Sequence, residues 1–219
     1  KNYKFKLRDI WDLENNFYLR SDKSRLNKVI CHYEIFKKTI NVPGKIIECG
    51  VFKGISLIRF LTFRDLLKKT LQKKVIGFDA FGKFPKQKIK EDNFFAKSHD
   101  TRIGLGFSEK VLKKILKKKK FKNFQLIKGN IEKTIPDFLR KNKNLKISFL
   151  HLDLDVFKPT ELALRLLYKS VSKKGIILID DYAQVQGATK ATKNFLKINK
   201  NIKLQRLNFD KRLFFIIKK

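Results

Sequence analysis

Two adjacent aspartates, Asp180 and Asp181, follow the apolar run in the segment "IILIDDYA". The chain contains only 20 Asp and Glu against 53 Lys and Arg, so paired acids after a buried strand need an explanation. Neighbouring carboxylates repel each other unless a positive charge lies beside them. Asp153 and Asp155 occur in a second segment, "HLDLDVF", and their alternate spacing places them on the same side if the strand continues.

The four carboxylates together predict a site for a divalent cation. Both pairs of aspartates end strands that we expect to be neighbours in one sheet, where ligands bind at the carboxyl ends. Ligand sets made of oxygen alone suit Mg²⁺ or Ca²⁺. Taken singly, Asp155 or Asp180 could instead cap a helix or pair with a nearby lysine. Which of the two adjacent aspartates touches the ion stays open at this point.

The segment "ECGVFKG" (residues 48–54) predicts a tight turn from a strand into a helix. Gly50 and Gly54 would let a ligand approach the backbone, and the helix N-terminus offers free amide groups. The turn matches neither the dinucleotide nor the phosphate-loop glycine motif, and the two glycines could serve packing alone. Asp79 ends the next predicted strand, where an acid typically accepts hydrogen bonds from ribose hydroxyls. The alternative for Asp79 is an acid that shapes the local turn.

The three histidines are weaker candidates than the acids. His32 lies in a predicted helix and His151 in a predicted strand, so we interpret both as structural. His99 lies beside Asp100 in residues 82–106, a stretch without a regular pattern that we expect to be irregular. A loop over the strand ends would make His99 a candidate substrate contact or general base.

Alternating strands and helices are expected to position these residues. The first forty-odd residues predict a helical cap, strongest over residues 21–40 and capped by Ser21 or Asp22, and the "VPG" at residues 42–44 ends it. The pattern then predicts strands at residues 45–50, 73–81, 124–130, 147–155 and 175–183. Helices are expected at residues 56–71, 107–120, 131–142, 159–171 and 188–199, and two final strands at 203–208 and 212–219. Such alternation indicates a mostly parallel sheet, with the last two strands antiparallel.

Length and composition indicate one α/β domain over residues 1–219, with a cap at 1–43 and a core at 44–219. No apolar run approaches the roughly 18 to 20 residues that span a bilayer, and the start lacks the features of a signal peptide. Cys31 and Cys49 have no metal-type spacing, so we expect free thiols in a cytoplasmic protein. The absence of Met and the start at Lys1 suggest a trimmed N-terminus.

The net charge of +33 raises the alternative of a basic nucleic-acid-binding protein. The sequence contains 43 Lys and only 10 Arg, although Arg is the residue favoured for bidentate phosphate recognition. The lysines are spread along the chain, with one dense cluster at residues 110–122. We therefore interpret the lysine excess as a compositional bias and expect a small-molecule partner, with neither nucleic acid nor a membrane span. A basic surface would still help to attract a phosphorylated or nucleotide-linked substrate.

Five ordered stretches between residues 43 and 195 resemble the macrocin (TylF-type) sugar O-methyltransferases, which depend on S-adenosylmethionine. The stretches are "PGKIIECGVFKGISLIRF", "VIGFDAFGKFP", "LIKGNIEKTIP", "LHLDLDVFKPTELAL" and "GIILIDDYAQVQGATKATKNF". The resemblance implies the Rossmann-like class I methyltransferase fold, which has a mostly parallel seven-stranded sheet and an antiparallel last strand. Two positions depart from the family pattern: Ala80 stands where Ser is usual, and Phe157 where Tyr is frequent. Both departures weaken any inference about the methyl acceptor.

The resemblance also implies residue roles. It assigns Glu48, Gly50 and Gly54 to the methionine end of the cofactor, and Asp79 to the ribose. It places Gly129, Asn130 and Ile131 beside the adenine, and assigns to the same cofactor site Cys49, Ser56, Ala80 and Phe81. It further assigns Asp153, Asp180 and Asp181 to Mg²⁺, with Asp153 also receiving the proton of the acceptor hydroxyl.

The predicted function is therefore O-methylation of a hydroxyl on a deoxysugar, with S-adenosylmethionine and Mg²⁺ as cofactors. The sugar would be nucleotide-activated or part of a polysaccharide or natural-product precursor. A catechol-like or other small diol is the alternative acceptor, because it shares nearly all of the motifs. A basic nucleic-acid-binding protein is the alternative from another class, and it leaves the acids at the strand ends unexplained. A homo-oligomer is compatible with the sequence.

Overall fold

The computed structural model describes residues 10–219, so the part of the predicted cap at residues 1–9 lies outside the described residues. A seven-stranded sheet has the order β3-β2-β1-β4-β5-β7-β6. Its strands are β1 (Lys45–Cys49), β2 (Val75–Asp79), β3 (Phe124–Lys128), β4 (Ile147–Leu152), β5 (Val171–Ile179), β6 (Leu204–Gln205) and β7 (Phe214–Ile217). The pairs among β1 to β5 are parallel, and β7 is antiparallel to both β5 and β6. The predicted mostly parallel sheet with an antiparallel last strand is confirmed.

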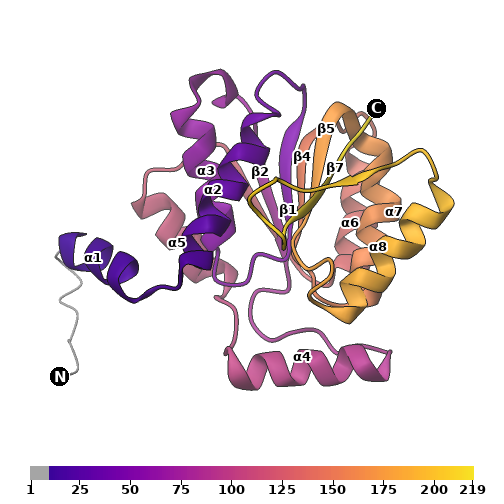
Figure 1. The fold of residues 1–219 in the computed structure, drawn as a ribbon, viewed down its shortest axis with the longest axis horizontal. Coiled ribbons are helices and arrows are strands. Elements are labelled where there is room, and N and C mark those ends of the chain that lie inside the picture. The colour runs from indigo at the N-terminus through magenta and orange to yellow at the C-terminus, as the bar shows by residue number, and fades with distance from the viewer. Residues whose placement is uncertain (1–9) are drawn as a thin grey trace.

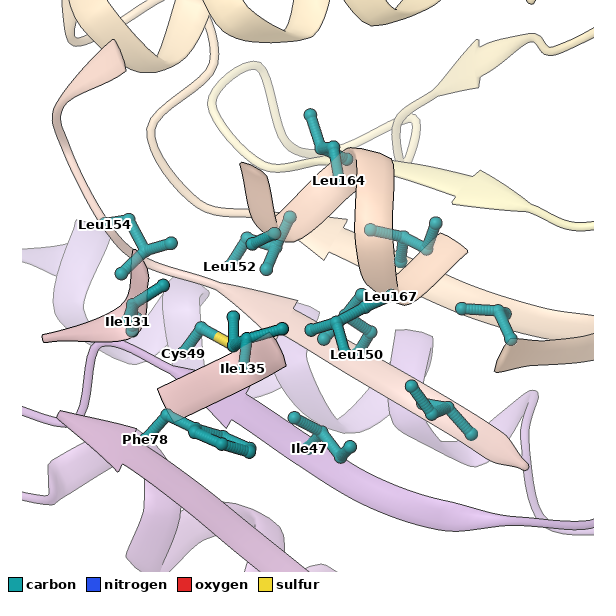
Figure 2. Packing of buried hydrophobic residues seen from close by; sticks show 14 of the residues in the cluster. Ile47, Cys49, Phe78, Ile131, Ile135, Leu150, Leu152, Leu154, Leu164 and Leu167 are labelled. Carbon is teal, nitrogen blue, oxygen red and sulfur yellow. The ribbon is translucent and has the colours of Figure 1, made fainter. Parts of the chain in front are cut away.

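Helices cover both faces of the sheet (Figure 1). One face carries α2 (Lys23–Lys37), α3 (Ile55–Leu66) and α5 (Glu109–Lys118), and the other carries α6 (Ile131–Lys141), α7 (Phe157–Leu167) and α8 (Gln186–Ile198). Side chains alternate between the faces along each strand, so Ile46 packs in the cluster under α2 and α3 while Ile47 packs in the opposite cluster. Figure 2 shows this second cluster, in which Leu150 and Leu152 of β4 lie against Leu164 and Leu167 of α7.

The cap begins with α1 (Ile10–Arg20), which extends away from the sheet, and continues with α2, which packs against α3 (Figure 1). The side chain of Asp22 caps α2 by accepting a hydrogen bond from the amide of Ser24 at 2.8 Å, as one of the two predicted caps. The α2 helix is tied to the C-terminal end of the chain, because Asn27 Nδ2 donates to Asp210 Oδ1 at 2.6 Å. In the part of the chain from residue 10 onward, no helix combines the length and apolar character that crossing a membrane requires.

Two expectations about secondary structure were wrong. The stretch at residues 82–106 contains a helix, α4 (Lys90–Arg102), which crosses the carboxyl ends of the strands (Figure 1). Its sequence, "KEDNFFAKSHDTR", buries only Asp92 and Ala96, so it lacks the apolar stripe that reveals a helix. The helix expected to reach residue 171 ends as α7 at Leu167, and β5 starts at Val171, not at residue 175. Exposed lysines at positions 173 and 174 bulge from β5, which hides its beginning in the sequence.

The remaining boundaries differ less from the predictions. Short 3₁₀ turns, η1 (Lys68–Thr70) and η2 (Tyr168–Ser170), follow α3 and α7. The strand expected at residues 203–208 is only two residues long, and the strand expected at 212–219 is four. The division into a cap at 1–43 and a core at 44–219 within one domain stays a prediction.

The turn after β1 depends on a glycine because it touches the neighbouring strand end. Gly50 has a φ of +90°, and a Cβ atom there would lie 1.7 Å from the carbonyl oxygen of Asp153. We expect Gly50→Ala to destabilise the protein by more than about 4 kcal/mol in urea unfolding, because backbone must move to admit the methyl group. Gly82→Ala is the control: Gly82 also has a positive φ, but nothing lies within 4 Å of its added Cβ. Equal losses in the two variants would contradict the steric explanation.

Candidate active site

The carboxyl ends of the strands open into a cavity of about 380 Å³. Predicted site residues from distant parts of the chain line it together: Gly50, Asp79, Ala80, His99, Gly129, Asn130, Ile131, Asp153, Asp180 and Asp181. Five other predicted cofactor residues do not line it: Glu48, Cys49, Gly54, Ser56 and Phe81. All five are buried: Cys49 and Phe81 belong to the hydrophobic clusters, and a Cβ on Gly54 would meet Leu112 of α5 at 2.5 Å.

Asp79 holds the glycine turn at one end of the cavity. Its Oδ2 accepts hydrogen bonds from the amides of Val51 and Phe52 at 2.7 and 2.9 Å. Its Oδ1 accepts one from the amide of Phe81 at 2.6 Å. The acid therefore shapes both neighbouring turns, which was the alternative interpretation from the sequence. A carboxylate has about four lone-pair sites, so capacity remains for a ribose hydroxyl, and that role stays a prediction.

Asn130 also has two roles, because it lines the cavity and caps a helix. Its side chain accepts a hydrogen bond from the amide of Glu132 at 2.9 Å and so caps α6. Its neighbour Gly129 has a φ of +139° and donates its amide to the carbonyl oxygen of Asp79 at 2.9 Å. The predicted adenine-side residues are thus fixed to the predicted ribose-side residue through the backbone.

The two adjacent aspartates point to different sides of the sheet. Along β5, Leu178 packs in the cluster under α2, and Ile179 packs in the opposite cluster. The alternation continues past the strand: Asp180 contacts Lys28 and His32 of α2, whereas Asp181 Oδ2 accepts a hydrogen bond from the amide of Asp155 at 3.0 Å. The repulsion expected between neighbouring carboxylates is therefore reduced by geometry before any cation is considered.

Asp153, Asp155 and Asp181, which we call the acid group, place carboxylate oxygens within 4.8 Å of one another. Burial and the charges of Asp180 and Asp181 raise the pKa of Asp153 well above its ordinary value. Burial and the charge of Asp153 raise the pKa of Asp155 to about 7, and burial with the charge of Asp155 raises that of Asp181. Like charges held together out of water disfavour ionisation. The acid group is therefore short of positive charge.

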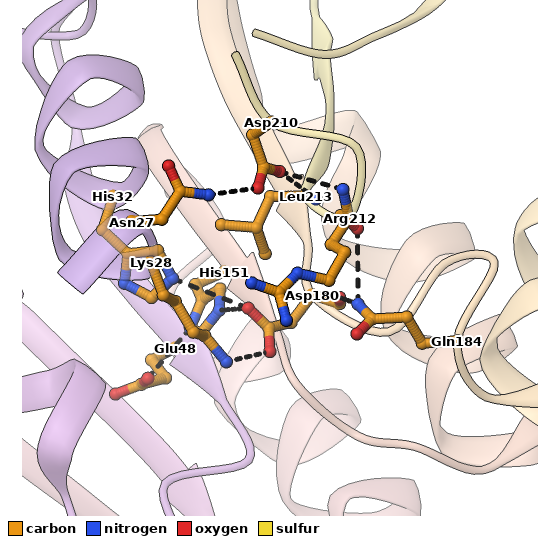
Figure 3. A network of polar contacts seen from close by, with 10 residues as sticks. All are labelled: Asn27, Lys28, His32, Glu48, His151, Asp180, Gln184, Asp210, Arg212 and Leu213. Atoms are coloured by element: carbon orange, nitrogen blue, oxygen red, sulfur yellow. Dashed lines mark hydrogen bonds and ion pairs between the residues drawn. The ribbon is translucent and has the colours of Figure 1, made fainter. Parts of the chain in front are cut away.

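Asp180 belongs instead to a buried network with Lys28, His32, Glu48 and His151 (Figure 3). His151 bridges two acids, with Nδ1 at 2.9 Å from Glu48 Oε1 and Nε2 at 3.5 Å from Asp180 Oδ1. Burial alone would lower the pKa of His151, but the contacts with Asp180 and Glu48 raise it to about 10. Burial alone would raise the pKa of Asp180, but His151, His32 and Lys28 hold it well below its usual range. Asp180 is thus an ionised carboxylate with its own cations.

His32 and His151 are both completely buried, which agrees with the structural role predicted for them. Burial lowers the pKa of His32 to about 4, so its ring is neutral. His99 differs from the prediction in its surroundings, because it lies on α4 and not in a loop. Its ring contacts are Phe52, Phe84 and Phe95, and burial lowers its pKa. Its proposed role as a base stays a prediction, and its contacts place it beside the glycine turn.

Several cavity residues could not be recognised in the sequence. Ser24, Arg25 and Lys28 enter from the first turns of α2, while Asp210 and Arg212 enter from the turn before β7. Nothing in the sequence distinguishes Lys28 among the 43 lysines or Arg25 among the 10 arginines, since only the docking of α2 brings them to the strand ends. The sequence did contain a feature that indicates the network around Asp180. Glu48 and His151 occupy the inward positions of two strands, where an unpaired polar residue would be costly.

The paired charges of Glu48 and His151 predict a pH-dependent stability. The raised pKa of His151 means that the pair stabilises the fold fully below the ordinary histidine value of about 6.5 and loses this effect as the pH rises through about 10. We expect Glu48→Gln to lose about 3 kcal/mol of unfolding free energy at pH 6 and much less at pH 10. Glu34→Gln, which breaks an exposed pair with Lys37, should lose far less unfolding free energy at either pH, because exposed pairs contribute little. A pH-independent loss in Glu48→Gln would contradict the assignment.

Solved structures with the same fold include three methyltransferases. CalS11, described as a calicheamicin methyltransferase, is 21% identical over 97% of this chain and 86% of its own, with a TM-score of 0.82. The O-methyltransferase NovP is 20% identical over 88% of this chain and 79% of its own, with a TM-score of 0.75. MycE of the mycinamycin pathway is 12% identical over 97% of this chain and 64% of its own, with a TM-score of 0.50. These likenesses show the class I methyltransferase fold.

The comparisons by sequence give one result for the family. A search of curated proteins finds no match. The family model described as macrocin O-methyltransferase (TylF) matches residues 20–215, which include strands β1 to β6, the first half of β7 and every residue lining the cavity. The family predicted from the ordered stretches is thereby confirmed: the chain belongs to the macrocin O-methyltransferase (TylF) family of methyl-transferring enzymes.

Proposed function

We propose that the protein transfers a methyl group from S-adenosylmethionine to a hydroxyl of a deoxysugar, with Mg²⁺ held by the aspartates of the cavity. The observation that carries the proposal is that the acid group shares one cavity with Gly50, Asp79 and Asn130, the residues proposed for the cofactor. Family membership supports the reaction type. A structure of the similar fold MycE is described as a complex with Mg, SAH and mycinamycin VI, which supports both cofactors.

The cofactor half of the cavity suits a nucleoside with an amino-acid tail. Asp79 keeps capacity for a ribose hydroxyl, and the backbone around Gly129 and Ile131 lines the place proposed for the adenine. Phe52 and His99 add aromatic surface beside the glycine turn, with ring centroids 5.2 Å apart. When bound there, S-adenosylmethionine supplies a methyl group already activated by its positively charged sulfur. The residues of this half bind and orient it.

The acceptor half of the cavity suits a divalent cation. Its donors are carboxylate oxygens only, the set that Mg²⁺ prefers, and the acid group lacks compensating charge. We propose Asp153 and Asp181 as ligands, with Asp155, whose oxygen lies within reach of both, as the third. Asp180, the third ligand implied by the family resemblance, is already paired with Lys28 and His151. Mg²⁺ bound there supplies positive charge that makes the acceptor hydroxyl more acidic.

Asp153 is proposed to receive the proton of the acceptor hydroxyl. It follows β4, lines the cavity and is fixed by its own amide, which donates to the carbonyl oxygen of Cys49 at 2.9 Å. The environment that raises its pKa also makes it a better proton acceptor than an exposed aspartate. The turn around Gly50 contacts the Asp153 backbone, so the cofactor turn and the base are held in fixed relation. Such alignment of the two reactants lowers the entropic part of the barrier.

The proposed acceptor is a class of molecule and not a single compound. A structure of CalS11, matching 97% of this chain at 20% identity with a TM-score of 0.74, is described as a TDP-rhamnose 3'-O-methyltransferase. This supports a nucleotide-activated deoxysugar, whereas the mycinamycin VI in the MycE complex supports a natural-product precursor. A catechol-like diol would use the same aspartates, and no contact in the cavity favours it. A cytoplasmic location and a homo-oligomer stay predictions, the first supported by the two free, buried cysteines.

Cofactor binding is the first test of the proposal. We expect S-adenosylmethionine to bind the protein at a single site in calorimetry. Asp79→Asn should weaken binding about tenfold or more, because the carboxylate serves the ribose and holds two amides of the glycine turn. Asp137→Asn is the matched control, since Asp137 is exposed on α6 and pairs with Arg140. No heat from the unchanged protein at high concentration would refute the proposed activity.

Turnover tests the aspartates separately from the cofactor. In methyl transfer to a pool of nucleotide sugars, we expect EDTA to abolish activity and Mg²⁺ to restore it. Asp153→Asn should lower turnover by about a hundredfold or more while S-adenosylmethionine binds as before, because the amide cannot accept the proton. Asp137→Asn should match the unchanged enzyme. Full, chelator-insensitive turnover in Asp153→Asn would remove both the metal and the base from the proposal.

A further inference from the structure

Two arginines line the cavity on its acceptor side. Arg25 lies in the first turns of α2, and Arg212 lies in the turn before β7. Arginine is scarce in this chain, with 10 Arg among 53 basic residues. Its planar guanidinium group forms paired hydrogen bonds with phosphate oxygens, which the ammonium group of lysine cannot do. In a chain with 43 lysines, two of the ten arginines at one cavity therefore indicate a specific task.

The backbone around both arginines is fixed. Asn27 Nδ2 donates to Asp210 Oδ1 at 2.6 Å and joins α2 to the turn before β7. The amide of Arg212 donates to Asp210 Oδ2 at 3.0 Å, and its carbonyl oxygen accepts from Gln184 Nε2 at 3.3 Å. Figure 3 shows the Arg212 side chain extending from this turn toward Lys28 and Asp180. The two guanidinium groups are thus presented to the cavity by anchored segments.

Neither side chain has an acidic partner that forms a salt bridge among residues 10–219. Arg64 and Arg140, by contrast, pair with Asp65 and Asp137 at 2.7 and 2.6 Å. Asp22, whose pKa is lowered mainly by Ser24 and slightly by Arg212, is engaged in capping α2. The mouth of the cavity therefore carries positive charge that the described residues leave uncompensated.

A third arginine, Arg59 of α3, lies near Arg25 but does not line the cavity. It is half-buried, and burial together with the charge of Arg25 lowers its pKa against the opposing charges of Asp180 and Glu48. Two guanidinium groups near each other repel unless an anion lies close to them. Arg25 is exposed, and no salt bridge within residues 10–219 supplies it with an anion, so its guanidinium group is free to bind one from a ligand.

The charges along the cavity have a definite order. The acid group lies at the ends of β4 and β5, and Lys28 comes next, paired with Asp180. Arg25 stands three residues before Lys28, on the same side of α2. Arg212 precedes β7, which pairs with β5 in one half of the sheet. The residues proposed for the cofactor follow β2 and β3, which lie in the other half of the sheet. The arginines therefore face the acceptor and not the adenosine.

We propose that Arg25 and Arg212 bind the diphosphate of a nucleoside-diphosphate sugar while its sugar hydroxyl lies at the acid group. The inference rests on the proposed function, and it selects the nucleotide-activated sugar from the acceptors named there. Free sugars, polysaccharides and neutral diols leave the arginines without a partner. A diphosphate also needs these cations, because the carboxylates deeper in the cavity repel it.

The test measures binding of nucleoside diphosphates without divalent cations, so that chelation by the aspartates does not contribute. dTDP, UDP and GDP are titrated into the protein saturated with S-adenosylhomocysteine, and we expect at least one to bind. Arg25→Gln or Arg212→Gln should weaken that binding about tenfold, and the double variant about a hundredfold. The matched control is the double variant Lys23→Gln with Lys211→Gln, which removes the same charge from exposed neighbours outside the cavity. S-adenosylhomocysteine should bind all variants equally.

The titrations distinguish the diphosphate site from a general charge effect and from the proposed function. Loss of diphosphate binding in the arginine variants alone supports the proposal. Equal losses in the arginine and lysine variants would show a general charge effect and overturn it. Binding of S-adenosylhomocysteine but of no diphosphate by the unchanged protein overturns the diphosphate site and leaves the methyl transfer intact. Weaker binding of S-adenosylhomocysteine in the arginine variants would assign the arginines to the cofactor, and absence of all binding would refute the proposed function as well.

Discussion

The site depends on the placement of neighbouring carboxylates, which repel one another, on different sides of the sheet. Alternation along β5 sends Asp180 toward the cap and Asp181 toward the opposite side, so two adjacent acids enter different surroundings. Asp180 is matched by Lys28 and by the His151 that Glu48 also holds. Asp181 joins Asp153 and Asp155 without such partners, and their pKa values rise. The fold thus neutralises one acid internally and leaves a concentrated negative charge for a ligand.

The parts of the fold that follow from local pattern were predictable from the sequence. Apolar runs gave the strands, and the positions of Gly50, Asp79 and Asp153 after those runs located the cavity. Helix α4 was missed because its buried residues number only two, and the start of β5 was missed because lysines interrupt it. Lys28, Arg25 and Arg212 were not predictable, since their roles arise from packing between segments far apart in the chain. Gly50 was correctly marked as special, although the structure ties it to the backbone of Asp153.

The two ends of the cavity carry different kinds of side chain, and the contacts explain how each end is held. At one end, Asp79 and Gly129 fix backbone turns to each other and leave groups suited to a nucleoside. At the other end, carboxylates and cations are arranged in sequence from the strand ends outward to the arginines of the mouth. The net charge of the whole protein gives little information about this arrangement. Within the cavity, the carboxylates lie at the strand ends and the arginines lie at the mouth, so negative and positive groups occupy separate places. Local placement, and not composition, determines which ligand the cavity accepts.

The bond between Asn27 and Asp210 joins residues 183 positions apart. Contacts of such separation carry a large loop-closure entropy and form late in folding, after local strand–helix units. On the ribosome the half proposed for the cofactor, built from residues 48–131, is synthesised well before the turn that carries Arg212. The acceptor half is therefore completed only when the last hairpin docks beneath α2. A chain cut short before that hairpin would keep most of the turns proposed to bind the nucleoside and lack one wall of the cavity proposed for methyl transfer.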